Sequence, residues 1–336
     1  MTHELKRIVR AYRGAKANKM KTVLATVVAL EGSSYRRPGV SMLILEDGKM
    51  IGAVSGGCVE KEISRQAQNV FSDDIPKMMT YDGRYRLGCE GILYILIEPF
   101  MPSEAFLTSF DDVISKRHVF QIISYFSKSD GSNPSLGSFF NFNETEISVR
   151  PNITRNLDLE VFTQKLEPCF KLIIIGAEHD AVQLCSFASL TGWEVTIIAS
   201  ASEEKTVNDF PGADNFLAVE PEMLSLSTID EQTAVLLMTH SHARDLKYLL
   251  AIKETKPIYL GLLGPAKRRE KLLGEFIEHY PEVSDMFFDN IHGPSGLNIG
   301  AETAQEIALA ILAEILSVTR GKEPMLLKNK SGRIHS

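Results

Sequence analysis

The spacing of hydrophobic positions in the first hundred residues is typical of short β-strands separated by turns. A β-branched, apolar run covers residues 22–30, and two shorter strands are expected on either side of Asp47-Gly48, a dipeptide typical of tight hairpins. From residue 59 to about 71 the period becomes helical, and an apolar strand over 91–100 follows. These elements predict an α+β domain over residues 1–105.

Residues 106–165 are expected to connect this domain to a second one. Two apolar runs, 118–126 and 135–143, are joined by a segment rich in Ser, Gly, Asn and Pro. Because these residues favour turns, the two runs predict a β-hairpin. The residues that follow, up to 165, show no clear period and predict no further element.

From residue 171 onward, continuous apolar strands alternate with helices. Strands are expected over residues 171–177, 193–200, 234–240 and 257–263. Helices are expected over residues 179–191, from about 243, and over 267–280 and 301–321. This alternation predicts a doubly wound parallel sheet with helices on both faces, an α/β, Rossmann-like domain over 166–321. In such sheets ligands bind outside the carboxyl ends of the strands. The polar tail 322–336 is expected to be mobile.

Composition narrows the class of protein. The 336-residue chain carries a net charge of −7, which argues against nucleic acid as its main partner. It has no apolar run of about 18 residues, so no membrane-spanning helix is expected, and the N-terminal segment lacks the apolar centre of a secretory signal. Four cysteines, at positions 58, 89, 169 and 185, form no C-x-x-C pair. A reduced, cytoplasmic protein is therefore expected.

The turn after the first strand of the second domain departs from the dinucleotide-binding fingerprint. Gly176 and Ala181 match the first and last positions of G-x-G-x-x-G/A, but Glu178 replaces the glycine that lets the backbone approach a pyrophosphate. The second strand ends at Ala199, where an acidic residue would hold a ribose. The fold is thus well supported, whereas binding of NAD(P) is doubtful.

Two histidines follow the fourth strand of this domain. Side chains at positions i and i+2 of a strand share a face, so His240 and His242 could point at one ligand. No third metal ligand is identified nearby. The alternative, in which one histidine caps a helix and the other packs, stays open.

A basic segment follows the next strand. Gly261 and Gly264 precede Lys267, Arg268 and Arg269. Glycine turns, a helix N-terminus and basic side chains together could bind an anion. A solvated basic helix face is the equally weighted alternative.

A glycine-rich loop precedes the last helix. Its residues with candidate roles are His292, Gly293, Gly296, Gly300 and Glu302. A loop of this composition is costly to order without a reason, so ligand contact is the favoured interpretation.

The N-terminal domain offers a thiol at the start of a helix. The segment Ser55, Gly56, Gly57, Cys58 is a glycine turn followed by helix formers such as Glu60. The helix dipole would lower the pKa of the Cys58 thiol. A nucleophilic cysteine also needs a histidine nearby, and residues 1–105 contain only His3. A hydrolase-like role is therefore disfavoured. Two other groups in this domain could contact a ligand, namely the arginines Arg36 and Arg37 and the thiol of Cys89.

Taken together, seven segments resemble the XdhC/CoxI family of xanthine dehydrogenase accessory proteins. They are residues 32–44, 52–63, 81–91, 173–181, 239–245, 259–270 and 291–315. The chain departs from the family pattern at Glu178, at Glu90, where a glycine is usual, and at Ala199, where an aspartate is frequent. These departures weaken the case for nucleotide binding more than the case for the fold.

The resemblance implies a factor that binds molybdenum cofactor and delivers it to xanthine dehydrogenase or a related molybdenum hydroxylase. A cofactor sulfurase is a further implied partner, and a homodimer is an open possibility; no nucleic acid or membrane partner is expected. The residues implied in cofactor binding are Arg36, Arg37, Ser55, Gly56, Gly57, Cys58, Glu60, Cys89, Gly176, His240, His242, Gly264, His292, Gly293, Gly296, Gly300 and Glu302.

Within that set, Cys58 would act as a soft ligand toward molybdenum. The resemblance implies a maturation factor more than a catalyst, and whether any catalytic turnover occurs stays open. Two other interpretations stay open: an NAD(P)-dependent oxidoreductase that uses the Rossmann-like domain, and a scaffold that only docks onto a molybdenum enzyme.

Overall fold

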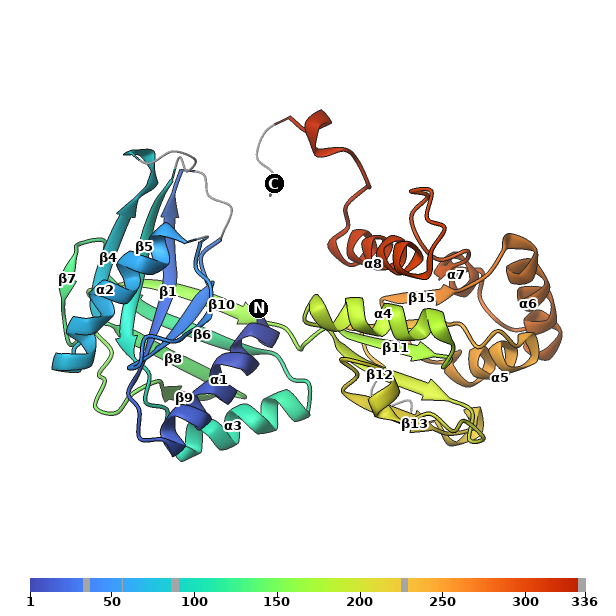
Figure 1. Ribbon diagram of the computed structural model, residues 1–336, viewed down its shortest axis with the longest axis horizontal. Helices are drawn as coiled ribbons and strands as arrows, with labels where there is room; N and C mark the ends of the chain where they lie inside the picture. The colour runs from blue at the N-terminus through green and yellow to red at the C-terminus, as the bar shows by residue number, and fades with distance from the viewer. Residues whose placement is uncertain (33–36, 56, 86–90, 225–228, 332–336) are drawn as a thin grey trace. The chain divides into compact units, whose positions relative to one another are not determined.

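The structure is a computed structural model that describes residues 1–32, 37–55, 57–85, 91–224 and 229–331 (Figure 1). The side chains of Cys58, Tyr85, Asp285 and Met286 also lie outside the description. The chain divides into two compact units, Met1–Pro168 and Cys169–Ser336. The first unit thus includes the segment that the sequence analysis expected to connect two domains.

A six-stranded antiparallel sheet forms one part of the first unit. Its strand order is β3–β2–β1–β5–β4–β7. The strands are β1 (Thr22–Glu31), β2 (Ser41–Leu45), β3 (Met50–Gly52), β4 (Lys77–Asp82), β5 (Ile92–Pro99) and β7 (Gly131–Ser132). Helix α2 (Cys58–Asp73) covers one face, because Val59, Ile63, Ala67 and Val70 recur at helical spacing and pack on the alternate apolar residues of the strands.

A second, four-stranded sheet follows, in the order β10–β6–β8–β9. Its strands are β6 (Phe120–Phe126), β8 (Gly137–Phe142), β9 (Thr145–Ser148) and β10 (Glu160–Leu166). Helices α1 (Thr2–Ala17) and α3 (Glu104–Ser115) share a phenylalanine-rich core with this sheet. The predicted hairpin is present as the antiparallel pair β6–β8. Strands β9 and β10 were not predicted, because most of their residues are exposed or half-buried and show no apolar face.

The second unit is the predicted Rossmann-like domain. Six parallel strands lie in the order β13–β12–β11–β14–β15–β16. They are β11 (Lys171–Ile175), β12 (Glu194–Ala199), β13 (Asn215–Ala218), β14 (Thr233–Leu237), β15 (Tyr259–Leu262) and β16 (Ile291–His292). The mixed α/β class predicted from the sequence is therefore confirmed.

Helices cover both faces of this sheet. On one face lie α4 (His179–Leu190) and α8 (Ala304–Arg320); on the other lie α5 (His242–Ile252), α6 (Ala266–His279) and the short α7 (Asp285–Asp289) (Figure 1). Alternate strand residues face the two layers of helices. Ile174 packs toward α4 and α8, and Ile173 packs toward α5 and α6. Short 3₁₀ helices lie at Gly83–Tyr85, Val207–Asp209, Pro221–Met223 and Leu327–Asn329.

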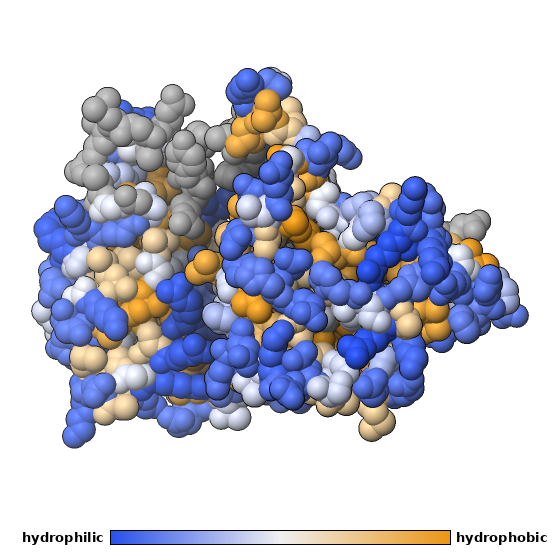
Figure 2. Space-filling model, turned by 45° about the vertical axis from the view of Figure 1, so that its right-hand side comes forward, coloured by the Kyte–Doolittle hydropathy of each residue, from blue (hydrophilic) through white to orange (hydrophobic). Residues whose placement is uncertain are grey.

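Exposed hydrophobic residues are dispersed over the chain. Leu157 and Leu190 are both 86% exposed, and the face in Figure 2 shows separate hydrophobic patches among hydrophilic residues. Single exposed apolar side chains are ordinary on protein surfaces. The dimer suggested by the sequence therefore stays a prediction. Among the described residues, no helix combines the length and hydrophobicity that a membrane crossing requires.

A fully buried carboxyl group lies between the two sheets of the first unit. Glu98 of β5 accepts hydrogen bonds from the backbone N–H of Ser138 at 3.0 Å and from its hydroxyl at 2.6 Å. The Ser138 hydroxyl also lies 2.8 Å from that of Ser124. Burial outweighs these bonds and the nearby charge of Arg150, and raises the pKa of Glu98 to about 7.

We therefore expect Glu98→Gln to stabilise the first unit at alkaline pH. The folded pKa lies above the ordinary value of 4.5, so wild-type stability declines as pH rises from about 4.5 to 7. The full shift corresponds to about 3 kcal/mol. Urea unfolding across this pH range should show the decline in the wild type and a flatter profile in the variant. The exposed Glu144→Gln serves as the control and should keep the wild-type profile. A wild-type profile that is flat over this range would contradict the assignment.

Candidate functional site

The carboxyl edge of the parallel sheet holds most of the candidate residues of the second unit. The chain leaves β11 toward β12 on one side and later adds β14 on the other, so the strand order reverses between β11 and β14. At this point Gly176 has a φ of +141°, and a Cβ there would lie 2.4 Å from the carbonyl oxygen of Met238. Only glycine fits at this position, because the ends of β11 and β14 are in close contact.

The helix that begins at this turn carries two acidic residues. Glu178 is the N-cap of α4 and Asp180 lies in its first turn, while Lys205 donates a hydrogen bond to the carbonyl of Ala177. A helix N-terminus normally attracts phosphate, but carboxylates at the same place oppose it. The geometry thus adds Asp180 to the reasons that make NAD(P) binding doubtful.

His240 and His242 do not have the strand geometry expected from the sequence. Strand β14 ends at Leu237, His240 adopts a left-handed conformation with φ of +56°, and His242 is the first residue of α5. His242 Nε2 lies 2.9 Å from Glu275 Oε2, whereas His240 Nε2 lies 3.9 Å from Asp180 Oδ2. The expectation that both imidazoles share one face of a strand is therefore wrong. Their contact with a ligand stays a prediction.

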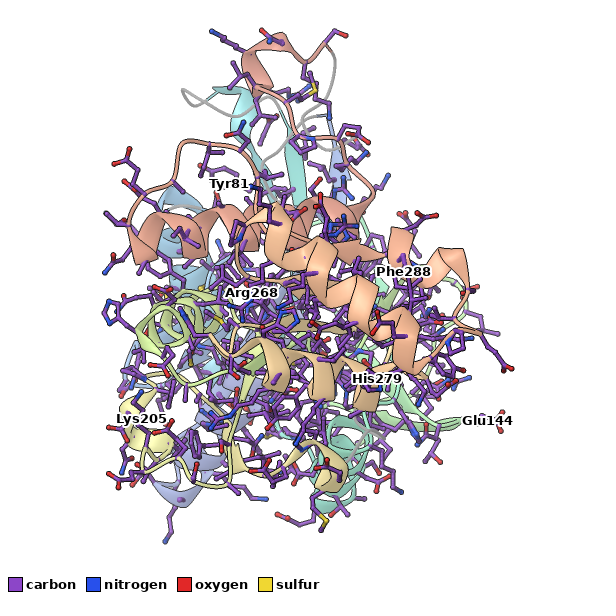
Figure 3. All side chains as sticks on the ribbon, turned by 90° about the vertical axis from the view of Figure 1, so that its right-hand side faces the viewer. Tyr81, Glu144, Lys205, Arg268, His279 and Phe288 are labelled. Carbon is purple, nitrogen blue, oxygen red and sulfur yellow. The ribbon has the colours of Figure 1, made fainter. Side chains whose placement is uncertain are left out.

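A buried aspartate fixes the loop that carries these histidines. The side chain of Asp245 is 3% exposed and accepts hydrogen bonds from the backbone N–H of Thr239 at 3.2 Å and from its hydroxyl at 2.7 Å. Arg268 Nη2, at the start of α6, donates to the other oxygen at 2.6 Å. Figure 3 labels Arg268. Arg268 therefore holds α6 against the β14–α5 loop, and its charge is already paired.

A second carboxylate organises the loop that follows β16. Glu314 of α8 accepts a hydrogen bond from the Tyr259 hydroxyl at 2.6 Å and another from the backbone N–H of Gly296 at 2.6 Å. Its other oxygen lies 3.0 Å from His292 Nδ1, and the His292 ring stacks on that of Tyr259 at 4.4 Å. An ionised carboxylate only accepts, so His292 donates to Glu314 through its Nδ1–H.

Burial and hydrogen bonding act on Glu314 in opposite directions. Burial raises the pKa of this carboxyl, but the bonds from His292, Tyr259 and Gly296 outweigh it, and the net pKa is lowered. Burial also raises the pKa of Tyr259, which stays a neutral donor. The loop 293–300 is further anchored to α8 through the N–H of Leu297, which donates to the carbonyl of Ala310.

A third carboxylate organises one candidate loop of the first unit. Glu60 of α2 accepts backbone hydrogen bonds from Val54 at 3.2 Å, Ser55 at 2.6 Å and Gly57 at 2.6 Å. Burial raises the pKa of Glu60, but these bonds outweigh it and leave the pKa lowered. Glu60 was predicted to contact a ligand; here it holds the turn that precedes Cys58, the first residue of α2.

The remaining candidates are distributed as follows. Arg37 is exposed, and Arg36, Gly56 and Cys89 lie outside the described residues. Gly264 has a φ of +121°, and a Cβ there would lie 2.9 Å from Arg268 Cδ. Gly300 and Glu302 lie before α8, where the N–H of Glu302 donates to Glu306. Among the residues that the structure describes, no three His, Cys, Asp or Glu side chains form a metal-binding group.

Sequence reasoning missed Tyr259 and Glu314, and it treated Asp245 only as the residue after the two histidines. Tyr259 and Glu314 are 55 positions apart, so no local spacing connects them. The sequence offers one weak signal for Glu314. It is a glutamate inside the apolar run of the last helix, and it lies neither at a capping position nor on the exposed side.

We expect Glu314→Gln to loosen the loop after β16. An amide accepts more weakly and presents a donor to one of its three partners, so the folded state should lose about 1–3 kcal/mol. Because the folded pKa of Glu314 is lowered, its contribution is present at neutral pH and is lost as pH falls through that pKa. Thermal unfolding and exchange of the Gly296 amide should both report the change. The exposed Glu278→Gln should change neither; a protected Gly296 amide in Glu314→Gln would refute the role.

Comparison with known proteins gives concordant matches over both units. The family model described as XdhC and CoxI family matches residues 15–82, and the XdhC Rossmann domain matches residues 172–315. A Bacillus subtilis protein named as a probable xanthine dehydrogenase subunit is 29% identical, over 89% of this chain and 94% of its own. The molybdenum cofactor insertion chaperone PaoD of Escherichia coli is 26% identical, over 96% and 91%.

A solved structure agrees with these matches. The crystal structure of a xanthine dehydrogenase from Bacillus halodurans superposes with a TM-score of 0.77 at 26% identity. The superposition covers 97% of this chain and 98% of that one, so the similarity extends over both units.

Proposed function

Because the chain belongs to the XdhC and CoxI family, we propose that it is a maturation factor that binds molybdenum cofactor and delivers it to a molybdenum hydroxylase of the xanthine dehydrogenase type. The observation that carries the proposal is the match, over 96% of the chain, to a protein named as a molybdenum cofactor insertion chaperone. The relative whose name refers to xanthine dehydrogenase supports the class of client.

The chemistry of the cargo suits the two loop regions. Molybdopterin carries a phosphate, a polar pterin with donors and acceptors, and sulfur atoms that hold the metal. In the first unit, a Cβ at Gly57 would meet no described atom within 4 Å, so the start of α2 is open on this side. In the second unit, Glu314 fixes the orientation of the His292 ring through Nδ1.

Individual residues take different roles in this proposal. Cys58 approaches the metal as a soft ligand, and Arg36 and Arg37 hold the phosphate or the pterin. Glu60 acts through the backbone, since its carboxylate sets the turn that presents Cys58. The cofactor is protected while bound and is presented to a sulfurase before transfer. The protein performs this as a homodimer in the cytoplasm.

A nicotinamide-dependent oxidoreductase is the competing function, and the reversal of strand order at β11 is the feature in its favour. The carboxylates of Glu178 and Asp180 at the same point count against it. Titration with NADH and NADPH separates the two functions: we expect no saturable binding, and tight binding of either nucleotide would favour the oxidoreductase.

We expect Cys58→Ala to weaken molybdopterin binding about tenfold, the loss of one metal–thiolate contact in a larger set. Fluorescence titration of the purified protein with isolated cofactor measures the affinity, and activation of cofactor-free client enzyme measures delivery. Cys169→Ala is the matched control, because Cys169 is a buried core thiol. Equal affinity of Cys58→Ala and wild type would remove Cys58 from the site. Failure of the wild type to bind the cofactor would reject the proposed function.

A further inference from the structure

One arginine at the carboxyl edge of the parallel sheet has no partner in the described part of the chain. Four cations lie at the start of α6: Arg268 is paired with Asp245, Lys271 lies 3.7 Å from Glu275, and Lys267 is exposed. Arg269 is half-buried, and its Nε is inaccessible to solvent and makes no hydrogen bond. Its two Nη groups also lack described partners, but they are not enclosed. The outer donors of the guanidinium therefore face solvent.

The surroundings hold the stem of this arginine in place. A Cβ at Gly293 would lie 2.9 Å from Arg269 Cδ and 3.3 Å from its Cγ. The stem of Arg269 thus packs against the loop that leaves β16. Any residue other than glycine at position 293 would displace it. A long side chain that is packed along its stem loses little further entropy when its head group binds a ligand.

An unpaired guanidinium in this position is costly. A buried donor without an acceptor destabilises the folded state by about 1–3 kcal/mol, and more where the group is charged. Arginine does not relieve the cost by losing its proton, because the guanidinium is not deprotonated in proteins. The Nη groups beside the buried Nε can pair with a bound anion, since phosphate oxygens match the fork of guanidinium N–H groups.

The helix itself favours the same class of ligand. The first turns of α4, α5 and α8 each contain an acidic residue, namely Asp180, Asp245 and Glu306, whereas that of α6 contains none. The partial positive charge at the start of α6 is therefore not offset locally. Arg269 and the start of α6 lie together at the carboxyl edge of the parallel sheet, where ligands of this fold bind.

From this arrangement we propose that Arg269 is the phosphate-binding residue of the second unit, and that it holds a phosphate group placed between the start of α6 and the loop after β16. The inference deepens the proposed function and rests on it only for the identity of the physiological phosphate compound. Arg268 and Lys267 are not part of this contact.

Titration of the full chain with inorganic phosphate and with pyrophosphate tests the inference without any cofactor. We expect saturable binding, with a shift of the Arg269 Nε–H resonance in the nitrogen-15 spectrum. Arg269→Gln should weaken pyrophosphate binding about tenfold or more. Lys267→Gln, which removes an exposed charge from the same helix turn, should weaken it less than about threefold. Gly293→Ala displaces the arginine without removing it and should also weaken binding.

Thermal unfolding shows that each variant is folded before its affinity is compared. The inference is overturned if the wild type binds neither anion, if Arg269→Gln binds pyrophosphate as the wild type does, or if Lys267→Gln loses as much affinity. Competition identifies the source of the phosphate: displacement of pyrophosphate by molybdopterin assigns it to the cofactor. Pyrophosphate binding that molybdopterin leaves unchanged supports a site for a different phosphate compound. Either result is independent of client activation, which tests the proposed function.

Discussion

A carboxylate on a helix accepts hydrogen bonds from the backbone of a neighbouring loop at three places, and the candidate loops depend on this interaction. Glu60 holds the turn before Cys58, Asp245 holds the β14–α5 loop, and Glu314 holds the loop after β16. Each loop is rich in small or polar residues that would not order by hydrophobic packing. A charge-assisted bond from a rigid helix supplies the order instead.

The same interaction determines which loops remain able to bind an anion. Where a carboxylate already occupies the start of a helix, as at α2 and α5, the backbone donors and the dipole are satisfied from within. The expectation that the helix dipole lowers the pKa of the Cys58 thiol stays a prediction. The start of α6 is different, because Nε of Arg269 makes no hydrogen bond within the described residues.

The sequence predicted the second unit well because its pattern is repetitive and local. Strands such as β11 are continuous apolar runs, and the glycine turn at residue 176 has one steric explanation. It predicted β9 and β10 poorly, since edge strands with exposed residues have no apolar period. The predicted strand geometry of His240 was wrong, because β14 ends three residues earlier than the apolar run suggested. Glu314 could not be assigned at all, since its partners come together only when α8 packs on the sheet.

The buried carboxyl of Glu98 couples the folding of the first unit to the uptake of a proton. Between about pH 4.5 and 7 this group is ionised in the unfolded chain and protonated in the folded one. Folding in that range takes up a proton from the buffer. The enthalpy measured by calorimetry consequently includes the ionisation heat of the buffer, so two buffers at the same pH give different apparent heats of folding for an identical structural transition.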